Sequence, residues 1–299
     1  MSGKSNPNLF VGIFLYENMM SGKISPFSAP CGAEVTGVDF SKPVEKDFIK
    51  ILNRAFVKYS VLVVRNQRLT PKQMVVAVGY FGSIFEQQNK RFSIPECPEV
   101  HYISNQESYP DGTRYIPGAG FHTDHSNDIM PPKATVLLAV CLPNKGGDTQ
   151  FVNMHAAYKD LGPETKKRLS DLRAIHVYQS TLSKRKLMDL SKENSRFVPK
   201  SAVHPLIRVH PETGKKSLYI NPIRIQSIIG MAEQEGIDLL NDLLEHATQK
   251  KYQYRHQWQP RDMVFWDNRC LLHKANGDYD LTQERFLYRI MLQGDEQGH

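Results

Sequence analysis

The sequence predicts a mainly β protein with flanking helices, built as a double-stranded β-helix of the jelly-roll, cupin-like type. After about residue 100, short segments rich in β-branched and aromatic residues recur at fairly regular spacing, a pattern typical of closed or double-sheet β folds. Helical periodicity in that part is confined to residues 156–171 and 236–248. With 299 residues, 40% of them apolar, the chain can bury one large core, so we expect one domain over residues 1–299.

The first hundred residues are expected to form an α+β preface to this core. Apolar residues alternate over residues 32–38, which predicts a strand, and they fall on one helical face over residues 44–57. The apolar run at residues 61–64 predicts a second strand. Residues 71–81 have helical spacing after the start signal Thr70-Pro71.

The second part of the chain contains most of the expected core strands. Their content of β-branched and aromatic residues is typical of strands. The predicted strands are residues 134–142, 217–220, 252–258, 263–266 and 286–292. Residues 180–201 are polar and lack periodicity, so we expect a surface loop there, with an active-site lid as a hypothesis.

Composition limits the cellular setting and the partners. The four cysteines are widely scattered, which argues against a disulfide framework or a zinc ribbon and fits a reducing cytoplasm. The apolar run at residues 9–16 is too short to span a bilayer and lacks a cleavage signal, so we expect a terminal strand or docking segment and no membrane partner. The basic residues behind the net charge of +7 are dispersed, which disfavours a nucleic-acid partner and favours small anionic substrates.

The chain contains a set of residues suited to one metal ion, namely His122, Asp124 and His273. On a strand, residues two apart point to the same face, so His122 and Asp124 can reach one ion. His273 follows a buried-looking strand and is expected near its end or in a turn, where functional groups tend to lie. Two imidazoles and one carboxylate form the facial triad of non-heme Fe(II) oxygenases, which leaves three coordination positions open.

The order of the motifs resembles that of the taurine dioxygenase and 2,4-dichlorophenoxyacetate dioxygenase (TauD/TfdA) family of Fe(II)/2-oxoglutarate-dependent enzymes. No single motif is decisive, but their order and spacing are specific. The matching segments are residues 32–39 (GAEVTGVD), 121–124 (FHTD), 146–149 (GGDT), 204–206 (HPL), 210–214 (HPETG), 266–269 (WDNR) and 285–289 (RFLYR).

The resemblance implies a cofactor set and the residues that hold it. Fe(II) would be bound by the triad, and the distal carboxylate of the cosubstrate 2-oxoglutarate by Thr149 and Arg285. A guanidinium can bond a carboxylate bidentately, and a hydroxyl adds an uncharged donor. Dioxygen would be the second cosubstrate, and succinate and carbon dioxide the expected products.

The resemblance also suggests how substrate is recognised. Arg289 lies four residues after Arg285, so both share one face of a regular strand, and family members use this second arginine to hold an acidic group. If the strand is bulged, Arg289 would face solvent instead. His125 and Arg224 are further candidates for substrate contact. Departures from the taurine-selective pattern near residues 81–88 and 118–120 argue against taurine itself.

The reaction class stays open within this family. Hydroxylation, C–X cleavage after hydroxylation and desaturation all remain, whereas halogenation is disfavoured because Asp124 fills the position a halide would need. A zinc-dependent hydrolase using the same three ligands is an alternative, as is a non-catalytic jelly-roll binding protein. Family members often form homo-oligomers, so we expect a dimer or tetramer.

Overall fold

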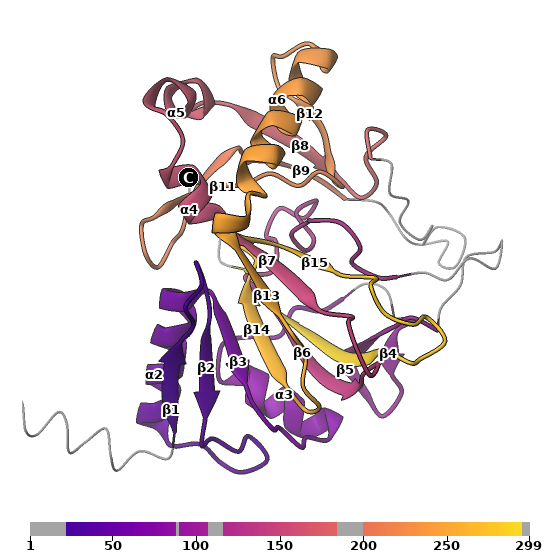
Figure 1. Ribbon diagram of the computed structural model, residues 1–299. Coiled ribbons are helices and arrows are strands. Elements are labelled where there is room, and N and C mark those ends of the chain that lie inside the picture. Colours follow the sequence, from indigo (N-terminus) through magenta and orange to yellow (C-terminus); the bar gives the residue numbers. More distant parts are fainter. Residues whose placement is uncertain (1–21, 88–89, 107–115, 184–199, 295–299) are drawn as a thin grey trace, which may run out of the picture.

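The computed structural model describes residues 22–87, 90–106, 116–183 and 200–294. The terminal strand expected at residues 9–16 and most of the lid hypothesised at residues 180–201 lie outside these ranges. Figure 1 shows a lower body built on a large sheet and an upper part that contains the longest of the later helices. None of the helices in the described ranges is long and apolar enough to cross a bilayer.

The largest sheet gives the lower body its shape. Within the described residues it has eight strands, in the spatial order β1 (Lys23–Pro26), β2 (Ala33–Thr36), β3 (Val61–Val64), β14 (Met263–Asp267), β6 (Ala134–Cys141), β16 (Phe286–Leu292), β5 (Cys97–Ser104) and β4 (Ser93–Ile94). Helices α2 (Lys46–Tyr59) and α3 (Pro71–Gly79) pack on its outer face, as both ribbon views show. The apolar stripes of these helices meet alternate strand residues such as Phe265 and Val136.

A smaller sheet faces the inner side of the large one. Its strands, in the order β13 (Gln253–His256), β7 (Thr149–Asn153) and β15 (Leu271–Ala275), are antiparallel neighbours. Phe151 and Leu271 of this sheet share an apolar core with Trp266, Leu137 and Leu287 of the large sheet. The two sheets packed face to face give the jelly-roll core, so the predicted fold class is confirmed.

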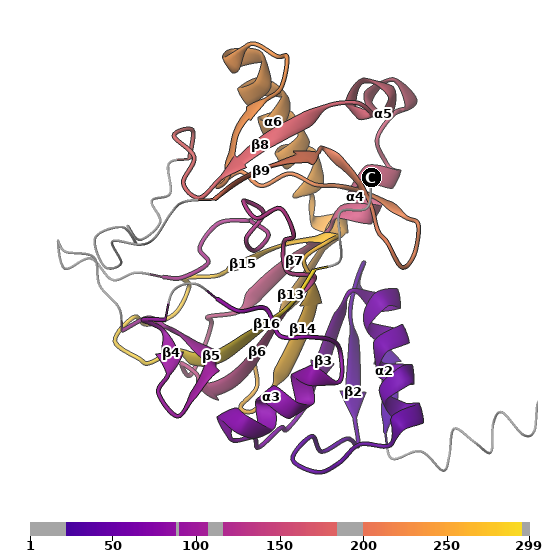
Figure 2. The same cartoon turned by 180° about the vertical axis from the view of Figure 1, so that it is seen from behind.

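The upper part covers the end of this core (Figure 2). Its apolar cluster is centred on Leu206, Leu218 and Leu243. Its elements are α4 (Met154–Lys159), α5 (Pro163–Leu169), β8 (Arg173–Val177), β9 (Ser201–Pro205), β10 (Ile207–Val209), β11 (Lys216–Leu218), β12 (Ile225–Ile228), α6 (Glu233–Ala247) and the 3-10 helix η2 (Lys250–Tyr252).

Most predicted elements are present, and the differences have local causes. Strands β3 and β16 have the predicted bounds, and α3 begins with a capping box in which Thr70 and Gln73 bond each other's backbone. The single helix expected over residues 156–171 was wrong. The chain forms two short helices instead, because Gly162 is extended and Pro163 starts a new helix.

The N-terminal segment is an integral part of the core sheet. Strand β3 pairs in parallel with β2 and antiparallel with β14, a strand about 200 residues later in the chain. All four valine and leucine residues of β3 are fully buried, as expected for a strand that is covered on both faces. The preface predicted before the metal motif is therefore built into the large sheet.

Candidate metal centre

The backbone brings His122 and His273 side by side. The two residues form an isolated antiparallel bridge, in which His122 N–H donates to His273 O at 2.9 Å and His273 N–H donates to His122 O at 2.8 Å. The strand predicted at His122 and Asp124 was wrong, because the chain turns immediately after this bridge. His273 lies in the middle of β15, not at a strand end. The bridge therefore sets His122 beside His273, and the turn that follows it places Asp124 next to both.

The three predicted metal ligands converge. His122 Nε2 lies 3.7 Å from Asp124 Oδ1, and His273 Nε2 lies 3.7 Å from Asp124 Oδ2. One ligand atom from each residue lies within 4.8 Å of the other two. Because metal bonds to nitrogen and oxygen are about 2 Å long, the arrangement fits a single ion between the three side chains.

Hydrogen bonds orient the side chains of His122 and Asp124 at the site. His122 Nδ1 is 2.9 Å from the carbonyl oxygen of Gly120, which can only accept, so this nitrogen carries a proton and Nε2 is the ring nitrogen that faces Asp124. Asp124 is 8% exposed, and its Oδ2 accepts a hydrogen bond from the Thr135 hydroxyl at 2.6 Å. Burial alone would raise the pKa of the Asp124 carboxyl, but the adjacent imidazoles and Arg289 hold that pKa below its ordinary value.

Arg285 is a buried cation, as expected for the predicted 2-oxoglutarate site. It is 4% exposed, and its Nε donates to Gly147 O at 2.9 Å. Among the described residues no carboxylate lies within ion-pair distance of its guanidinium. Burial lowers the pKa of Arg285 to about 10. A buried guanidinium without a counter-ion is costly, so this position is suited to an anionic ligand.

Thr149 is the first residue of β7 and is also buried. Its hydroxyl oxygen accepts a hydrogen bond from Trp258 Nε1 at 3.0 Å, which leaves the hydroxyl proton available to a ligand. Arg255 Nε donates to Asp148 Oδ2 at 2.7 Å. Trp258 and Arg255 thus hold the start of β7 in place, and neither residue was predicted from the sequence. Both act from β13 or just beyond it, about 100 residues later, and no local motif marks them.

Arg289 lies on the inward face of β16, and Arg285 immediately precedes this strand. Leu287, between the two arginines, packs with Trp266 in the core between the sheets, and alternation places both arginines on the same side. The bulge that would have turned Arg289 outward is absent from β16, since the extra residue of the irregular pairing is Val140 of β6. The guanidinium lies close enough to lower the pKa of Asp124.

The other two predicted substrate residues lie near the metal ligands. His125 has a positive φ of 46° and its ring packs against Phe85 with centroids 5.5 Å apart. Burial, and after it the charge of Arg224, lowers the pKa of His125 to about 3. Arg224 Nη1 donates to Tyr178 O at 2.8 Å, and its guanidinium lies over the Tyr178 ring. The structure thus brings His125 and Arg224 into electrostatic contact.

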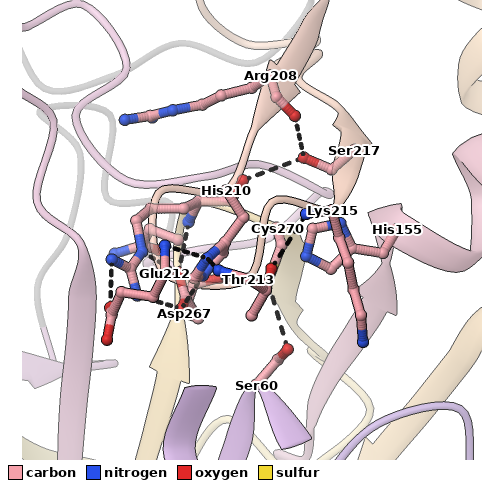
Figure 3. Close-up of polar contacts among 12 residues, drawn as sticks. Ser60, His155, Arg208, His210, Glu212, Thr213, Lys215, Ser217, Asp267 and Cys270 are labelled. Atoms are coloured by element: carbon pink, nitrogen blue, oxygen red, sulfur yellow. Dashed lines mark hydrogen bonds and ion pairs between the residues drawn. The ribbon is translucent and has the colours of Figure 1, made fainter. Parts of the chain in front are cut away.

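A second buried group also combines potential ligands, namely His210, Asp267 and Cys270. Figure 3 shows His210 and Asp267 pointing toward each other and Cys270 pointing toward Ser60. Both oxygens of Asp267 are occupied, because Oδ1 accepts from Arg269 Nε at 2.9 Å and Oδ2 accepts from Arg269 Nη2 at 2.7 Å and His210 Nε2 at 3.0 Å. Burial and the charge of Asp267 raise the pKa of the Cys270 thiol. A metal would have to displace the arginine, so this group is structural.

Comparisons with known proteins agree with this geometry. The taurine catabolism dioxygenase TauD, TfdA family matches residues 23–291. The (S)-phenoxypropionate/alpha-ketoglutarate-dioxygenase of Sphingobium herbicidovorans is 32% identical over 91% of this chain and 95% of its own length. The alpha-ketoglutarate-dependent sulfate ester dioxygenase of Pseudomonas putida is 29% identical over 91% of this chain and 89% of its own length.

A solved structure gives the same result for the fold. The crystal structure of AAD-2 in complex with Mn(II) and N-oxalylglycine superposes with a TM-score of 0.77 and 30% identity, covering 93% of this chain and 99% of that one. The family match spans most of the sequence and includes all three converging ligands. The chain therefore belongs to the TauD/TfdA family of dioxygenases and is an oxidoreductase.

Proposed function

We propose that this protein is an Fe(II)- and 2-oxoglutarate-dependent dioxygenase that oxidises a C–H bond of a small anionic substrate. The observation that carries the proposal is the convergence of His122, Asp124 and His273 within 4.8 Å. Two neutral imidazoles and one carboxylate match the donor set of non-heme iron oxygenases. When bound, iron with 2-oxoglutarate and dioxygen supplies the oxidising power for the C–H bond, and succinate and carbon dioxide are the coproducts.

The chain's own residues bind and orient the reactants. Arg285 and Thr149 are assigned to the distal carboxylate of 2-oxoglutarate, because one offers a buried guanidinium and the other an available hydroxyl proton. N-oxalylglycine, bound in the related AAD-2 structure, differs from 2-oxoglutarate by an NH in place of a methylene. The assignment gives the buried charge of Arg285 a counter-ion.

Arg289 is assigned to the anionic group of the substrate. Its Nη2 donates to Gln87 Oε1, which orients the side-chain amide of Gln87. Gln87 is buried, and its Nε2 has no hydrogen-bond partner in the described chain. A guanidinium with an adjacent amide donor suits an oxyanion, and the relatives named above act on a phenoxypropionate and on sulfate esters. His125 and Arg224 are proposed to contact the rest of the substrate.

The two alternatives raised by the sequence are not supported. A zinc hydrolase would leave the buried charge of Arg285 without a ligand, and a non-catalytic protein would not need the three converging donors. The relatives are named as alpha-ketoglutarate-dependent dioxygenases. A homo-oligomeric state, a cytoplasmic location, a single domain and a lid within residues 180–201 remain predictions.

The test is a substrate screen that measures succinate. The protein, supplied with Fe(II), 2-oxoglutarate and oxygen, is offered aryloxy acids, alkyl sulfate esters, sulfonates and uncharged analogues of the same carbon skeletons. We expect at least one anionic compound to stimulate succinate formation, and its uncharged analogue to be inert. Arg289→Met should raise KM for that compound. No stimulation by any anion, or equal stimulation by the uncharged analogue, would contradict the proposal.

A further inference from the structure

A threonine of the large sheet contacts the carboxylate of the candidate metal site. Thr135 lies on β6 opposite Trp266 of β14, and it is fully buried on the inner face of the sheet. Its hydroxyl donates to Asp124 Oδ2 at 2.6 Å. This distance is at the short end for a hydroxyl-to-carboxylate bond, as expected when the acceptor is charged.

The direction of this hydrogen bond is fixed by the next residue in the network. Asn268 Nδ2 donates to Thr135 Oγ1 at 2.9 Å, and Asn268 Oδ1 accepts from Trp266 Nε1 at 3.0 Å. An indole N–H can only donate, so the Asn268 amide has one possible orientation. The Thr135 oxygen therefore receives a proton from Asn268, and its own proton is directed to Asp124.

The same asparagine is anchored to the metal motif and to the sheet. Its backbone carbonyl accepts from the Thr123 hydroxyl at 2.9 Å, and its backbone N–H donates to Lys133 O at 2.9 Å. Asn268 is almost completely buried. Because every group in this network has a partner, the network holds the residue before Asp124 and the carboxylate of Asp124 as one rigid unit.

The two oxygens of Asp124 consequently differ. Within the described residues, only Oδ2 accepts a hydrogen bond. The Asp124 side chain is 11% exposed, and both of its oxygens face imidazoles: Oδ1 lies 3.7 Å from His122 Nε2, and Oδ2 lies 3.7 Å from His273 Nε2. The hydrogen bond from Thr135 therefore fixes the rotation of the carboxylate between the two histidines.

We propose that Thr135 is a positioning residue, which holds the Asp124 carboxylate in the orientation that presents it to the metal together with His122 and His273. The inference rests on the proposed iron site and adds a residue that no motif of the sequence marked. Without the hydroxyl the carboxylate can rotate away from the two imidazoles, so the ion that 2-oxoglutarate binds would be held less firmly. Loss of the hydroxyl should weaken both the metal site and 2-oxoglutarate binding.

Two matched pairs of side chains separate the effect of the hydroxyl from the effect of side-chain volume. Wild type and Thr135→Val have nearly the same shape, as do Thr135→Ser and Thr135→Ala, and each pair differs in the presence of the hydroxyl. Metal affinity is measured by calorimetric titration of the metal-free protein with Mn(II), and cosubstrate binding by the visible charge-transfer band with Fe(II) and 2-oxoglutarate under anaerobic conditions. Circular dichroism checks that each variant is folded.

We expect Mn(II) affinity and 2-oxoglutarate binding to depend on the presence of the hydroxyl and not on the volume of the side chain. Thr135→Val and Thr135→Ala should bind Mn(II) about tenfold more weakly and require more 2-oxoglutarate to develop the band, whereas Thr135→Ser stays close to wild type. If Thr135→Val does not fold, the serine and alanine pair gives the same comparison. Equal Mn(II) affinity and equal bands within both pairs would overturn the inference. Absence of the band in wild type would instead refute the proposed function, with the Mn(II) comparison still deciding the role of Thr135.

Discussion

Within the part of the chain that the structure describes, two clusters contain histidine and aspartate at metal-binding distances, and only one of them is suited to a metal. In the first, Asp124 accepts one hydrogen bond, from Thr135, and its two oxygens face His122 and His273. In the second, Asp267 has both oxygens bonded to Arg269, and Oδ2 is also bonded to His210. The two clusters contain similar residue types. Asp267 accepts three side-chain hydrogen bonds, whereas Asp124 accepts one.

A neighbouring arginine therefore determines whether a buried cluster of histidine and aspartate can bind a metal ion. Arg269 neutralises Asp267 and satisfies its lone pairs, so the cluster ties the turn at residues 210–214 to the segment that leads into β15. In the first cluster no arginine among the described residues bonds Asp124, and Arg289 lowers its pKa through charge. The second cluster stabilises the fold, and the first is available to an ion.

Removing the carboxylate of the first cluster is expected to have the largest effect on activity. Asp124→Ala leaves two imidazoles without the charged ligand, so we expect substrate-dependent succinate formation to fall by more than about 100-fold. The fold should persist, because the residue lies at the edge of the core and has one hydrogen-bonded side-chain partner. Activity within tenfold of wild type would show that Asp124 is not a ligand.

The equivalent change in the second cluster should affect stability instead. Arg269→Met leaves the fully buried Asp267 without its cation, and breaking a buried ion pair costs about 3–5 kcal/mol. Urea denaturation of the metal-free protein measures the free energy of unfolding. A loss below about 1 kcal/mol, or a loss of iron binding in the folded variant, would mean that the two clusters are not divided in this way.

Removing the cation of the cosubstrate site tests whether its charge is used by a ligand. Arg285→Met should weaken 2-oxoglutarate binding by about 2 kcal/mol or more, which is about 30-fold. Because Arg285 has no carboxylate partner in the described chain, the free energy of unfolding without ligand should not fall as it does for Arg269→Met. Unchanged 2-oxoglutarate affinity, measured by titration of the visible band, would remove Arg285 from the site.

The smallest effect is expected at the hydroxyl beside that arginine. Thr149→Val removes one uncharged hydrogen bond to the cosubstrate, so 2-oxoglutarate affinity should fall by about 1 kcal/mol, or roughly fivefold. Thr149→Ser, which keeps the hydroxyl that accepts from Trp258, should stay near wild type. A loss for the valine variant as large as that of Arg285→Met would show that Thr149 has a further role.

The sequence predicted the ligands better than the way the backbone presents them. His122, Asp124 and His273 were found because their residue types and motif context are local. Their convergence depends on a bridge between residues 151 positions apart in the chain, which alternation within one segment does not reveal. The alternation of side chains along a strand pointed to the right residues, although His122 and Asp124 do not lie on one strand.

The supporting residues were not predictable for the same reason. Gln87 meets Arg289 across 202 positions, and Asn268 meets Thr135 across 133. Each is an ordinary polar residue in its own segment, and its role arises from the pairing order of the large sheet. That order places β14 between β3 and β6 through contacts between distant segments, which periodicity does not encode.

The most direct test of the division between the two clusters is an anaerobic titration with Fe(II) in the presence of 2-oxoglutarate, followed by the visible charge-transfer band. We predict that the band saturates at one iron per chain in wild type and in folded Arg269→Met, and that it does not form in Asp124→Ala. A band of normal intensity in Asp124→Ala, or its loss in Arg269→Met alone, would contradict the account.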